Sequence, residues 1–330
     1  MISPDLPPEL KAALASKAEG LSRHEAAQRA GAISRTYRGG GGSDRIRTVE
    51  DALAYALARM PATYAAIAAS LNALVEATPE FAPQSMLDVG AGPGTATWAA
   101  AEAFASLDAF VLLDANTALR DLAISLAYTD SRPAAMRYEA GDARKLLASA
   151  QKADLVVASY VINELDDNER AAFADALWAK TSDILLVIEP GTPAGYARVI
   201  DLRARLIAQG AHVIAPCPHD VECPLEAPDW CHFSQRLQRS RAHKYLKGAE
   251  LPYEDEKFSY IVLSRSPATQ HPARVLTQPQ ATKIAVTAKL CTTGGVEVAA
   301  VRHRDKNQYK RARKWGWGDA VFPEQPAAPE

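Results

Sequence analysis

The stretch Met86-Leu87-Asp88-Val89-Gly90-Ala91-Gly92-Pro93-Gly94-Thr95 decides the fold of this 330-residue chain. A short apolar run typical of a strand leads directly into three glycines at alternate positions, and an alanine-rich helical pattern follows. Glycine lets the backbone approach a ligand closely, and a helix N-terminus offers N–H groups that have no partner inside the helix. The stretch therefore predicts a strand, a nucleotide-binding turn and a helix in succession.

The spacing of the glycines separates two kinds of nucleotide-binding turn. Dinucleotide dehydrogenases use a similar loop, but the third glycine of their fingerprint would fall at Thr95. Here the pattern is G-x-G-x-G, and an acid, Asp88, stands just before it. Together these features resemble the first motif of class I methyltransferases that bind S-adenosylmethionine. The resemblance implies that Asp88, Gly90, Gly92 and Gly94 belong to a cofactor site.

Two further acids fit the same interpretation. Asp114 ends the apolar run 110–113, where such enzymes place a carboxylate that accepts hydrogen bonds from both ribose hydroxyls. Asp142 lies in the segment 140–144, where a side chain contacts the adenine. Both stand at or near the carboxyl ends of predicted strands, where open α/β sheets bind ligands. We therefore expect S-adenosylmethionine as a cofactor, with Asp114 and Asp142 among the residues that bind it.

Strand and helix patterns alternate from residue 85 onward. Apolar runs typical of strands occupy residues 86–89, 109–113, 136–140, 155–159 and 184–188. Amphipathic stretches typical of helices occupy residues 95–105, 117–127, 167–180 and 196–209. This alternation predicts a parallel sheet that is covered by helices on both faces.

The regions on either side of this core have different patterns. Residues 7–77 have helical periodicity, and a glycine-rich break at 39–43 divides them into helices before and after a loop. After about residue 250, an antiparallel addition is predicted, with strands at 258–264, 283–290 and 296–301. We predict an α/β fold with a class I, S-adenosylmethionine-dependent methyltransferase (Rossmann-like) core, N-terminal helices and a Cys-rich, β-containing C-terminal extension. The predicted domains are 1–80 (helical), 81–212 (cofactor-binding core), 213–300 (Cys-rich metal-cluster region with added strands) and 301–330 (basic and aromatic tail).

Composition limits the class of protein. The chain has 37 Lys and Arg against 39 Asp and Glu, which excludes a chain that coats nucleic acid through overall positive charge. The N-terminus does not resemble a secretory signal. The longest stretch free of charged residues, 60–75, is shorter than the roughly 20 apolar residues of a membrane span. We therefore expect a cytoplasmic protein that has no membrane partner.

All four cysteines lie in the last third of the chain. Cys217, Cys223 and Cys231 fall within 15 residues, and Cys291 stands at the end of a predicted strand. In a reducing compartment such clustering favours metal binding over disulfides. The gaps are longer than those of typical zinc knuckles, and four thiolates suit either a structural zinc or a [4Fe–4S] cluster. For zinc, a nearby histidine can replace one cysteine, and the candidates are His212, His219 and His232.

The glycine motif and the cysteine segment together resemble one family. It comprises the methyltransferase-like proteins of the small ribosomal subunit, which are found in mitochondria and have bacterial relatives. The matching stretches are residues 54–56, 59–64, 87–94, 188–193, 216–224 and 230–233. The cysteine segment is the most specific part of the resemblance, and we identify the chain as a bacterial-type member of this family.

The resemblance implies a fold, a metal centre and a partner. Family members have a class I methyltransferase fold that carries a [4Fe–4S] cluster, and they associate with the small ribosomal subunit during its assembly. Carried over to this sequence, Cys217, Cys223, Cys231 and Cys291 are the four cluster ligands, with zinc as the alternative metal. The expected function is that of a small-subunit assembly factor that binds ribosomal RNA or the immature subunit.

No catalytic residue is assigned from the sequence. After the fourth predicted strand, amino-group methyltransferases acting on nucleic acid carry an Asx-Pro-Pro-aromatic motif, and residues 159–165 lack it. Asn163 and Glu164 can still orient an acceptor, because positioning supplies most of the rate in methyl transfer. The alternative function is therefore an active methyltransferase that modifies small-subunit ribosomal RNA or a ribosomal protein, and whether the fold is catalytically silent stays open.

Two basic segments are candidates for RNA binding. Residues 236–247 carry five Lys and Arg and no acid. Residues 302–317 carry seven Lys and Arg against Asp305 alone, with Tyr309, Trp315 and Trp317 interleaved. Cations bind phosphates, and aromatic rings stack on unpaired bases. We therefore expect the small ribosomal subunit and its RNA as partners, and we expect no DNA partner.

Overall fold

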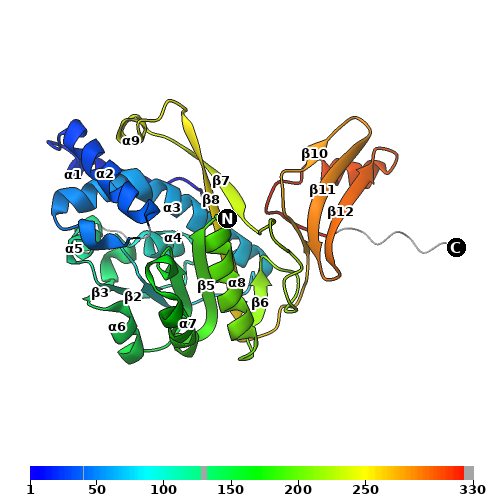
Figure 1. Cartoon of the computed structure of the whole chain (residues 1–330), viewed down its shortest axis with the longest axis horizontal. Helices are drawn as coiled ribbons and strands as arrows, with labels where there is room; N and C mark the ends of the chain where they lie inside the picture. Colours follow the sequence, from blue (N-terminus) through cyan, green and yellow to red (C-terminus); the bar gives the residue numbers. More distant parts are fainter. Residues whose placement is uncertain (40, 128–131, 323–330) are drawn as a thin grey trace.

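A computed structural model describes the chain except for residues 40, 128–131 and 323–330 (Figure 1). The last eight residues of the predicted basic and aromatic tail therefore lie outside the described residues. No helix in the described ranges is long and apolar enough to cross a membrane.

The N-terminal region is helical, as predicted. It contains α1 (Pro8–Lys17), α2 (Arg23–Arg38), a 3₁₀ turn η1 (Ser43–Arg45) and the 29-residue α3 (Val49–Ala77). Helix α3 begins at a capping box, in which Thr48 accepts a hydrogen bond from the Asp51 N–H and Asp51 accepts one from the Thr48 N–H. Small residues, mostly alanine, make up most of its buried face, so α3 packs closely against the elements around it.

The core is one twisted sheet in the strand order β3-β2-β1-β4-β5-β8-β6, with β7 paired to β8. The strands are β1 (Ser85–Val89), β2 (Ala109–Asp114), β3 (Arg137–Ala140), β4 (Ala153–Ser159), β5 (Thr181–Pro190), β6 (His212–Ala215), β7 (Phe233–Gln238) and β8 (Tyr253–Ser264). Strands β1 to β5 pair in parallel, and β8 lies antiparallel between β5 and β6. This order confirms the predicted Rossmann-like core with a parallel sheet. The strand order reverses between β1 and β4, and open α/β sheets bind ligands at such a switch point.

Alternate residues of the strands pack against different helices. Leu112, Leu155 and Leu186 share one apolar cluster with α3, α4 (Thr95–Ala103) and α5 (Thr117–Leu126). Val156 and Leu185 lie in a second cluster with α7 (Asp167–Lys180) and α8 (Pro193–Ile207). The period of two follows from strand geometry, and it confirms that helices cover both faces. The remaining short helices of this part are η2 (Arg132–Ala135), α6 (Ala143–Ser149) and η3 (Ile162–Glu164).

One strand lies where the sequence does not place it. The pattern after residue 250 assigns residues 258–264 to the C-terminal addition, but they form the apolar half of β8 in the main sheet. The register pairs Ile188 with Tyr260 and Leu186 with Val262, so this half of β8 is buried in the core. Periodicity alone does not reveal which sheet an apolar strand joins, because that depends on pairing between distant segments.

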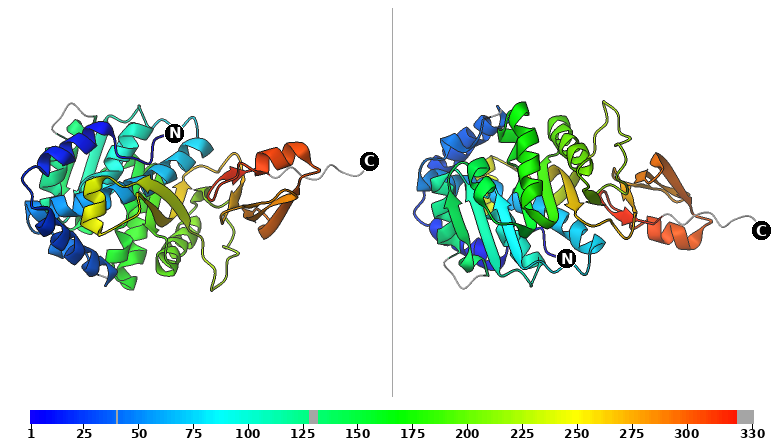
Figure 2. Two further views of the ribbon diagram at one scale, coloured as in Figure 1. Left: turned by 90° about the horizontal axis from the view of Figure 1, so that it is seen from above. Right: turned by 90° about the horizontal axis from the view of Figure 1, so that it is seen from below.

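The β7–β8 hairpin carries a short helix, α9 (Arg241–Lys247), that packs against α2 and α3 through Leu246. Beyond β8 the chain forms a separate antiparallel sheet. It consists of β9 (Ala273–Val275), β10 (Gln280–Ala281), β11 (Ala285–Thr292), β12 (Gly295–Arg302) and β13 (Ala320–Val321), with helix α10 (Lys306–Ala312) before the last strand. Figures 1 and 2 show this second sheet as a lobe beside the β6 edge of the core.

Candidate functional site

The glycine loop after β1 has the tight geometry that its sequence predicts. Gly90 has a φ of +72°, and a Cβ atom there would lie 2.4 Å from a methyl carbon of Val161. Gly94 is the left-handed N-cap residue of α4, with a φ of +79°. A side chain at either position would strain the turn, so the backbone conformation requires glycine at both. At Gly90 a side chain would also clash with Val161.

The loop forms one wall of a cavity of about 380 Å³. This volume lies within the ~300–1,000 Å³ range of small-molecule sites. The other walls come from the ends of β2 and β4, from the start of α6, and from Tyr37, Ser43 and Tyr55 of the N-terminal region. The cavity therefore stands at the switch point of the sheet, where the fold predicts ligand binding.

Four of the six predicted cofactor residues line this cavity, namely Gly90, Gly92, Asp114 and Asp142. The Asp114 carboxylate accepts hydrogen bonds from the Gly92 N–H at 2.8 Å and from the Asn116 N–H at 2.7 Å. It thus braces the glycine loop, and burial raises its pKa. Asp142 caps α6 by accepting the Arg144 N–H at 3.0 Å, and the Arg144 guanidinium lowers the pKa of Asp142.

The other two predicted residues, Asp88 and Gly94, do not line the cavity. Asp88 is completely buried and accepts hydrogen bonds from the Thr97 N–H at 3.2 Å and the Thr97 hydroxyl at 2.9 Å. Burial raises the pKa of Asp88 to about 7. Asp88 therefore ties β1 to the first turn of α4, and Gly94 shapes that turn. Both residues thus hold the glycine loop in its conformation without lining the cavity.

An N-terminal segment covers the cavity. Asn116 Nδ2 donates to the carbonyl oxygens of Ser43 at 3.0 Å and Ile46 at 2.9 Å. The Ser43 N–H also donates to Glu164, and a Cβ atom at Gly42 would lie 2.7 Å from a Glu164 carboxylate oxygen. Burial and the nearby charge of Asp114 raise the pKa of Glu164 to about 7. The sequence does not reveal this arrangement, because it joins a loop to side chains that lie 70 or more residues away.

Tyr160 is a further cavity residue, and the sequence does not single it out. It is the one residue other than glycine, within the described ranges, that has a positive φ, at +57°. Its hydroxyl donates to Glu256 at 3.2 Å. A left-handed tyrosine at the end of β4 costs about 1–3 kcal/mol, and such strain is concentrated at functional sites.

The four cysteines come together at a second, smaller cavity. Cys217 follows β6, Cys223 and Cys231 lie in the segment before β7, and Cys291 is on β11; all four line the same space. The Tyr196 hydroxyl lies 3.2 Å from Cys223 Sγ. All four thiols are free of disulfides. Within the described ranges, no three His, Cys, Asp or Glu side chains are positioned to hold a metal ion.

The thiols interact electrostatically across this cavity. Burial, followed by the charges of the neighbouring cysteines, raises the pKa of Cys231. Burial also raises the pKa of Cys291 to about 12, while Arg203 and Arg274 oppose this shift. Thiolates in this place therefore need a positively charged partner.

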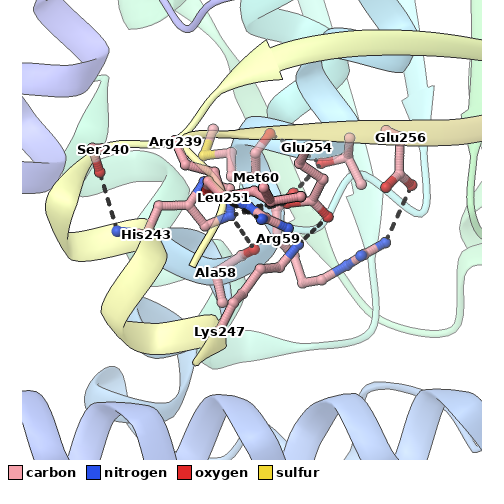
Figure 3. Close-up of polar contacts among 11 residues, drawn as sticks. Ala58, Arg59, Met60, Arg239, Ser240, His243, Lys247, Leu251, Glu254 and Glu256 are labelled. Carbon is pink, nitrogen blue, oxygen red and sulfur yellow. Dashed lines mark hydrogen bonds and ion pairs between the residues drawn. The ribbon is translucent and has the colours of Figure 1, made fainter. Parts of the chain in front are cut away.

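The first basic segment is largely paired inside the protein. Arg239, His243 and Lys247 converge on Glu254 of β8, and Arg59 of α3 lies 3.6 Å from Glu256 (Figure 3). This network fastens the β7–β8 hairpin and α9 to α3. In addition, Arg236 pairs with Asp255 at 2.7 Å. Only Arg241 and Lys244 of the five cations therefore have no carboxylate partner among the described residues.

The second basic segment differs from the first. Its exposed cations lie on β12, α10 and the turns beside them, and six of them form no ion pair within the described ranges: Arg302, Arg304, Lys306, Lys310, Arg313 and Lys314. Tyr309 and Trp315 pack beneath them against β11 and β12. The aromatic residues of this segment are thus partly used as core, while its cations are exposed to solvent.

Comparison with known proteins identifies relatives that cover most of the chain. The family described as "Mitochondrial small ribosomal subunit Rsm22" matches residues 49–322. The human protein "Ribosome assembly protein METTL17, mitochondrial" is 30% identical over 288 residues, which are 82% of this chain and 62% of that protein. "Rsm22-cox11 tandem protein 2, mitochondrial" of Schizosaccharomyces pombe is 25% identical over 334 residues, with 85% of this chain and 44% of that protein covered. The chain thus spans less than two thirds of the length of either relative.

Solved structures with a similar fold are more distant. Magnesium protoporphyrin IX methyltransferase from Synechocystis PCC 6803 has a TM-score of 0.41 and 13% identity, covering 70% of this chain and 93% of that chain. The plantazolicin methyltransferase BpumL has a TM-score of 0.43 and 10% identity, covering 74% of this chain and 98% of that chain. Similarities this low say nothing about function, and the strand order by itself establishes the Rossmann-like fold.

These relatives correct one expectation. The cytoplasmic location predicted from the sequence is wrong, because the matching family and the relatives are described as mitochondrial. Free cysteines indicate a reducing environment, and the cytoplasm is not the only such compartment. The relatives, from human and fission yeast, also give no support to the bacterial-type assignment.

Proposed function

Because the chain belongs to the Rsm22 family of the mitochondrial small ribosomal subunit, we propose that it is an assembly factor for that subunit. The match over residues 49–322 is the observation that carries this proposal, and the name of the human relative, a ribosome assembly protein, agrees with it. The domain ranges predicted from the sequence are part of the proposal, except that β6, β7 and β8 belong to the core sheet.

S-adenosylmethionine is the proposed occupant of the larger cavity. In the part of its wall that the structure describes, the charged side chains are four carboxylates and one cation: Asp114, Asp142, Glu164, Glu169 and Arg144. This excess of carboxylates favours a ligand with cationic groups, such as the sulfonium and ammonium groups of S-adenosylmethionine, and disfavours the pyrophosphate of a dinucleotide. Gly90, Gly92, Asp114 and Asp142 would contact the cofactor, while Asp88 and Gly94 would hold the loop in shape.

A [4Fe–4S] cluster, or alternatively zinc, is the proposed occupant of the cysteine cavity. Cys217, Cys223, Cys231 and Cys291 are its proposed ligands, and a set of four thiolates suits either metal centre. Support comes from Arg203, whose Nε atom is buried without a hydrogen-bond partner next to this region. When bound, the metal would supply folding energy to the segment between β6 and β7, which has no helix or strand of its own.

Ribosomal RNA is the proposed partner of the exposed cations around α10. These are Arg302, Arg304, Lys306, Lys310, Arg313 and Lys314, all without an ion pair among the described residues. Cations that are not used internally remain available for phosphates, and this distinguishes them from the paired segment on the β7–β8 hairpin.

An active methyltransferase is the second candidate function. The observation that favours it is the strained Tyr160 beside Glu164 in the cavity wall. A carboxyl group whose pKa is about 7 can accept a proton from a methyl acceptor near neutral pH. The acceptor would be small-subunit ribosomal RNA or a ribosomal protein.

One experiment separates the two candidates. Immature small subunits are incubated with the protein and S-adenosylmethionine carrying a labelled methyl group, in parallel with the variant Gly92→Arg, because a Cβ atom at Gly92 would meet no atom closer than 4.0 Å. An assembly factor co-sediments with the subunits, and the variant still supports assembly. Label in a single acceptor supports the enzyme if both the label and assembly are lost with the variant. Failure of the unchanged protein to co-sediment contradicts both candidates.

A further inference from the structure

Two arginines are buried beside the cysteine cavity. Arg203 on α8 is 2% exposed and Arg274 on β9 is 3% exposed. Within the described ranges neither forms an ion pair with a carboxylate, although the exposed Arg205 on the same helix as Arg203 pairs with Asp175. Burial of a guanidinium without an anion is costly, so two such cases at one place require an explanation.

Arg203 holds the loop that carries the first two cysteines. Its Nη2 atom donates to the carbonyl oxygens of His219 at 2.7 Å and Val221 at 2.8 Å. Both carbonyls lie between Cys217 and Cys223 in the chain. The Nε atom of Arg203 is buried and has no partner, so one strong donor is left unused.

Arg274 stands on the other side of the same cavity and forms part of its wall. It lies opposite Cys291 in the β9–β11 pair. Its Nε atom donates to the carbonyl oxygen of Pro216 at 3.0 Å, and its Nη1 atom donates to that of Gly318 at 2.8 Å. Arg274 thus joins the C-terminal sheet to the residue just before Cys217.

Besides these carbonyl oxygens, Arg203 contacts the Nδ1 atom of His219 at 3.5 Å and hydrogen-bonds the Cys217 side chain. Neutral groups of this kind solvate a guanidinium but do not compensate its charge. Four cysteine thiolates around Zn²⁺ or around a [4Fe–4S]²⁺ core form a complex with a net charge of about −2. Two buried guanidinium groups supply the matching positive charge. Each residue also positions the backbone next to Cys217, so charge balance and ligand placement come from the same two side chains.

We infer that Arg203 and Arg274 are the counter-charges and positioning residues of the metal centre held by the four cysteines. The inference rests on the proposed metal site. It adds to the four cysteine ligands two residues that are not themselves ligands of the metal. It also explains why the wall of this cavity, among the described residues, includes Arg274 but no acid.

The test compares charge-removing and charge-keeping variants of the full chain. Arg203→Met and Arg274→Met remove the charge, and Arg203→Lys and Arg274→Lys keep it. The exposed Arg205→Met, on the same helix as Arg203, and the exposed Lys283→Met, beside the same sheet as Arg274, are controls. After anaerobic purification, iron, sulfide and zinc are measured for each protein. The midpoint potential of the cluster and the rate of metal release to a chelator are then determined.

Removal of either charge is expected to disfavour addition of an electron to the cluster. The equilibrium constant for one-electron reduction should fall at least tenfold, which corresponds to a potential lower by about 59 mV. Metal release should be at least tenfold faster, for iron or for zinc. The Lys variants and both exposed controls should stay near the unchanged protein.

The outcomes separate this inference from the proposed function. Absence of metal from the unchanged protein overturns the proposed metal site and this inference with it. Metal in the unchanged protein, with the same potential and release rate in the Met variants, overturns the inference alone. Equal effects in the Met and Lys variants also overturn it, because hydrogen bonding to the loop would then be the role and not charge.

Discussion

Replacement of Gly90 by alanine should destabilise the protein by an amount that the structure allows us to divide into two parts. The left-handed backbone, with a φ of +72°, costs an ordinary residue about 1–2 kcal/mol. The new Cβ atom would lie 2.4 Å from Val161 Cγ2 and 2.6 Å from Val161 Cβ, and overpacking of this kind costs about 1–3 kcal/mol. Together these effects predict a loss of about 2–5 kcal/mol in the free energy of unfolding.

A matched control isolates the two parts. Gly210 has a φ of +87°, and a Cβ atom there would have no other atom within 4 Å. Gly210→Ala should therefore cost only the backbone part, about 1–2 kcal/mol. Val161→Ala in the Gly90→Ala background should recover a part of the overpacking cost, because it removes the methyl carbon at 2.4 Å but keeps the Cβ atom at 2.6 Å.

Urea denaturation of the two glycine variants, of Val161→Ala alone and of the double variant provides the measurement. Equal losses of stability in Gly90→Ala and Gly210→Ala would refute the reasoning. So would a double variant in which Val161→Ala adds its own cost without any recovery. Either result would mean that the segment after β4 moves freely away from the glycine loop.

Three other perturbations test the network, the cavity and the basic surface. Glu254→Gln leaves Arg239, His243 and Lys247 without their shared carboxylate and should lower the free energy of unfolding by about 3 kcal/mol. Asp255→Asn breaks an exposed pair and should lower it by about 0.5 kcal/mol in the same denaturation assay. Equal losses of stability in the two variants would contradict the role of the network. Because the pKa of Glu164 is raised to about 7 in the folded protein, that protein binds the proton more tightly than the unfolded chain does, so the free energy of unfolding should fall as pH rises from about 4.5 to 7. Glu164→Gln should flatten this slope, and an unchanged slope would show that the group titrates normally. Replacement of Arg304, Lys306, Lys310 and Lys314 by Gln should make RNA binding less dependent on salt. The slope of the logarithm of the binding constant against the logarithm of the salt concentration should become shallower by about 0.7–0.9 for each phosphate that is no longer neutralised. Arg205→Gln, which removes a cation already paired with Asp175, should leave this slope unchanged.

Much of the core could be predicted because its signals are local. The strand, glycine loop and helix at 86–105 are encoded by residues that are neighbours in the chain, and the structure has β1, the turn and α4 at those positions. The same holds for the alternation that leads to β5. In each case the spacing of the apolar residues, every two positions for a strand or every 3.6 for a helix, identifies the type of element without knowledge of any tertiary contact.

The parts that could not be predicted depend on pairing between distant segments. Residues 236–247 look like an RNA-binding surface in the sequence, because their counter-ions Glu254 and Asp255 come after them on the partner strand β8. The sequence names Glu164 as a residue that can orient an acceptor, but only the tertiary structure buries its carboxyl group near Asp114 and raises its pKa to about 7. Arg203 and Arg274 resemble ordinary surface arginines in the sequence, and only the tertiary structure buries them.

Metal and sulfide analysis of the anaerobically purified chain tests the central claim most directly. We predict a coloured protein with about four iron and four acid-labile sulfide per chain, lost when Cys217 or Cys291 is replaced by serine. A colourless protein with one zinc per chain would contradict the iron–sulfur assignment and leave the zinc alternative. A protein free of metal, and unchanged in stability by those serine substitutions, would contradict the claim that the four cysteines form a metal centre.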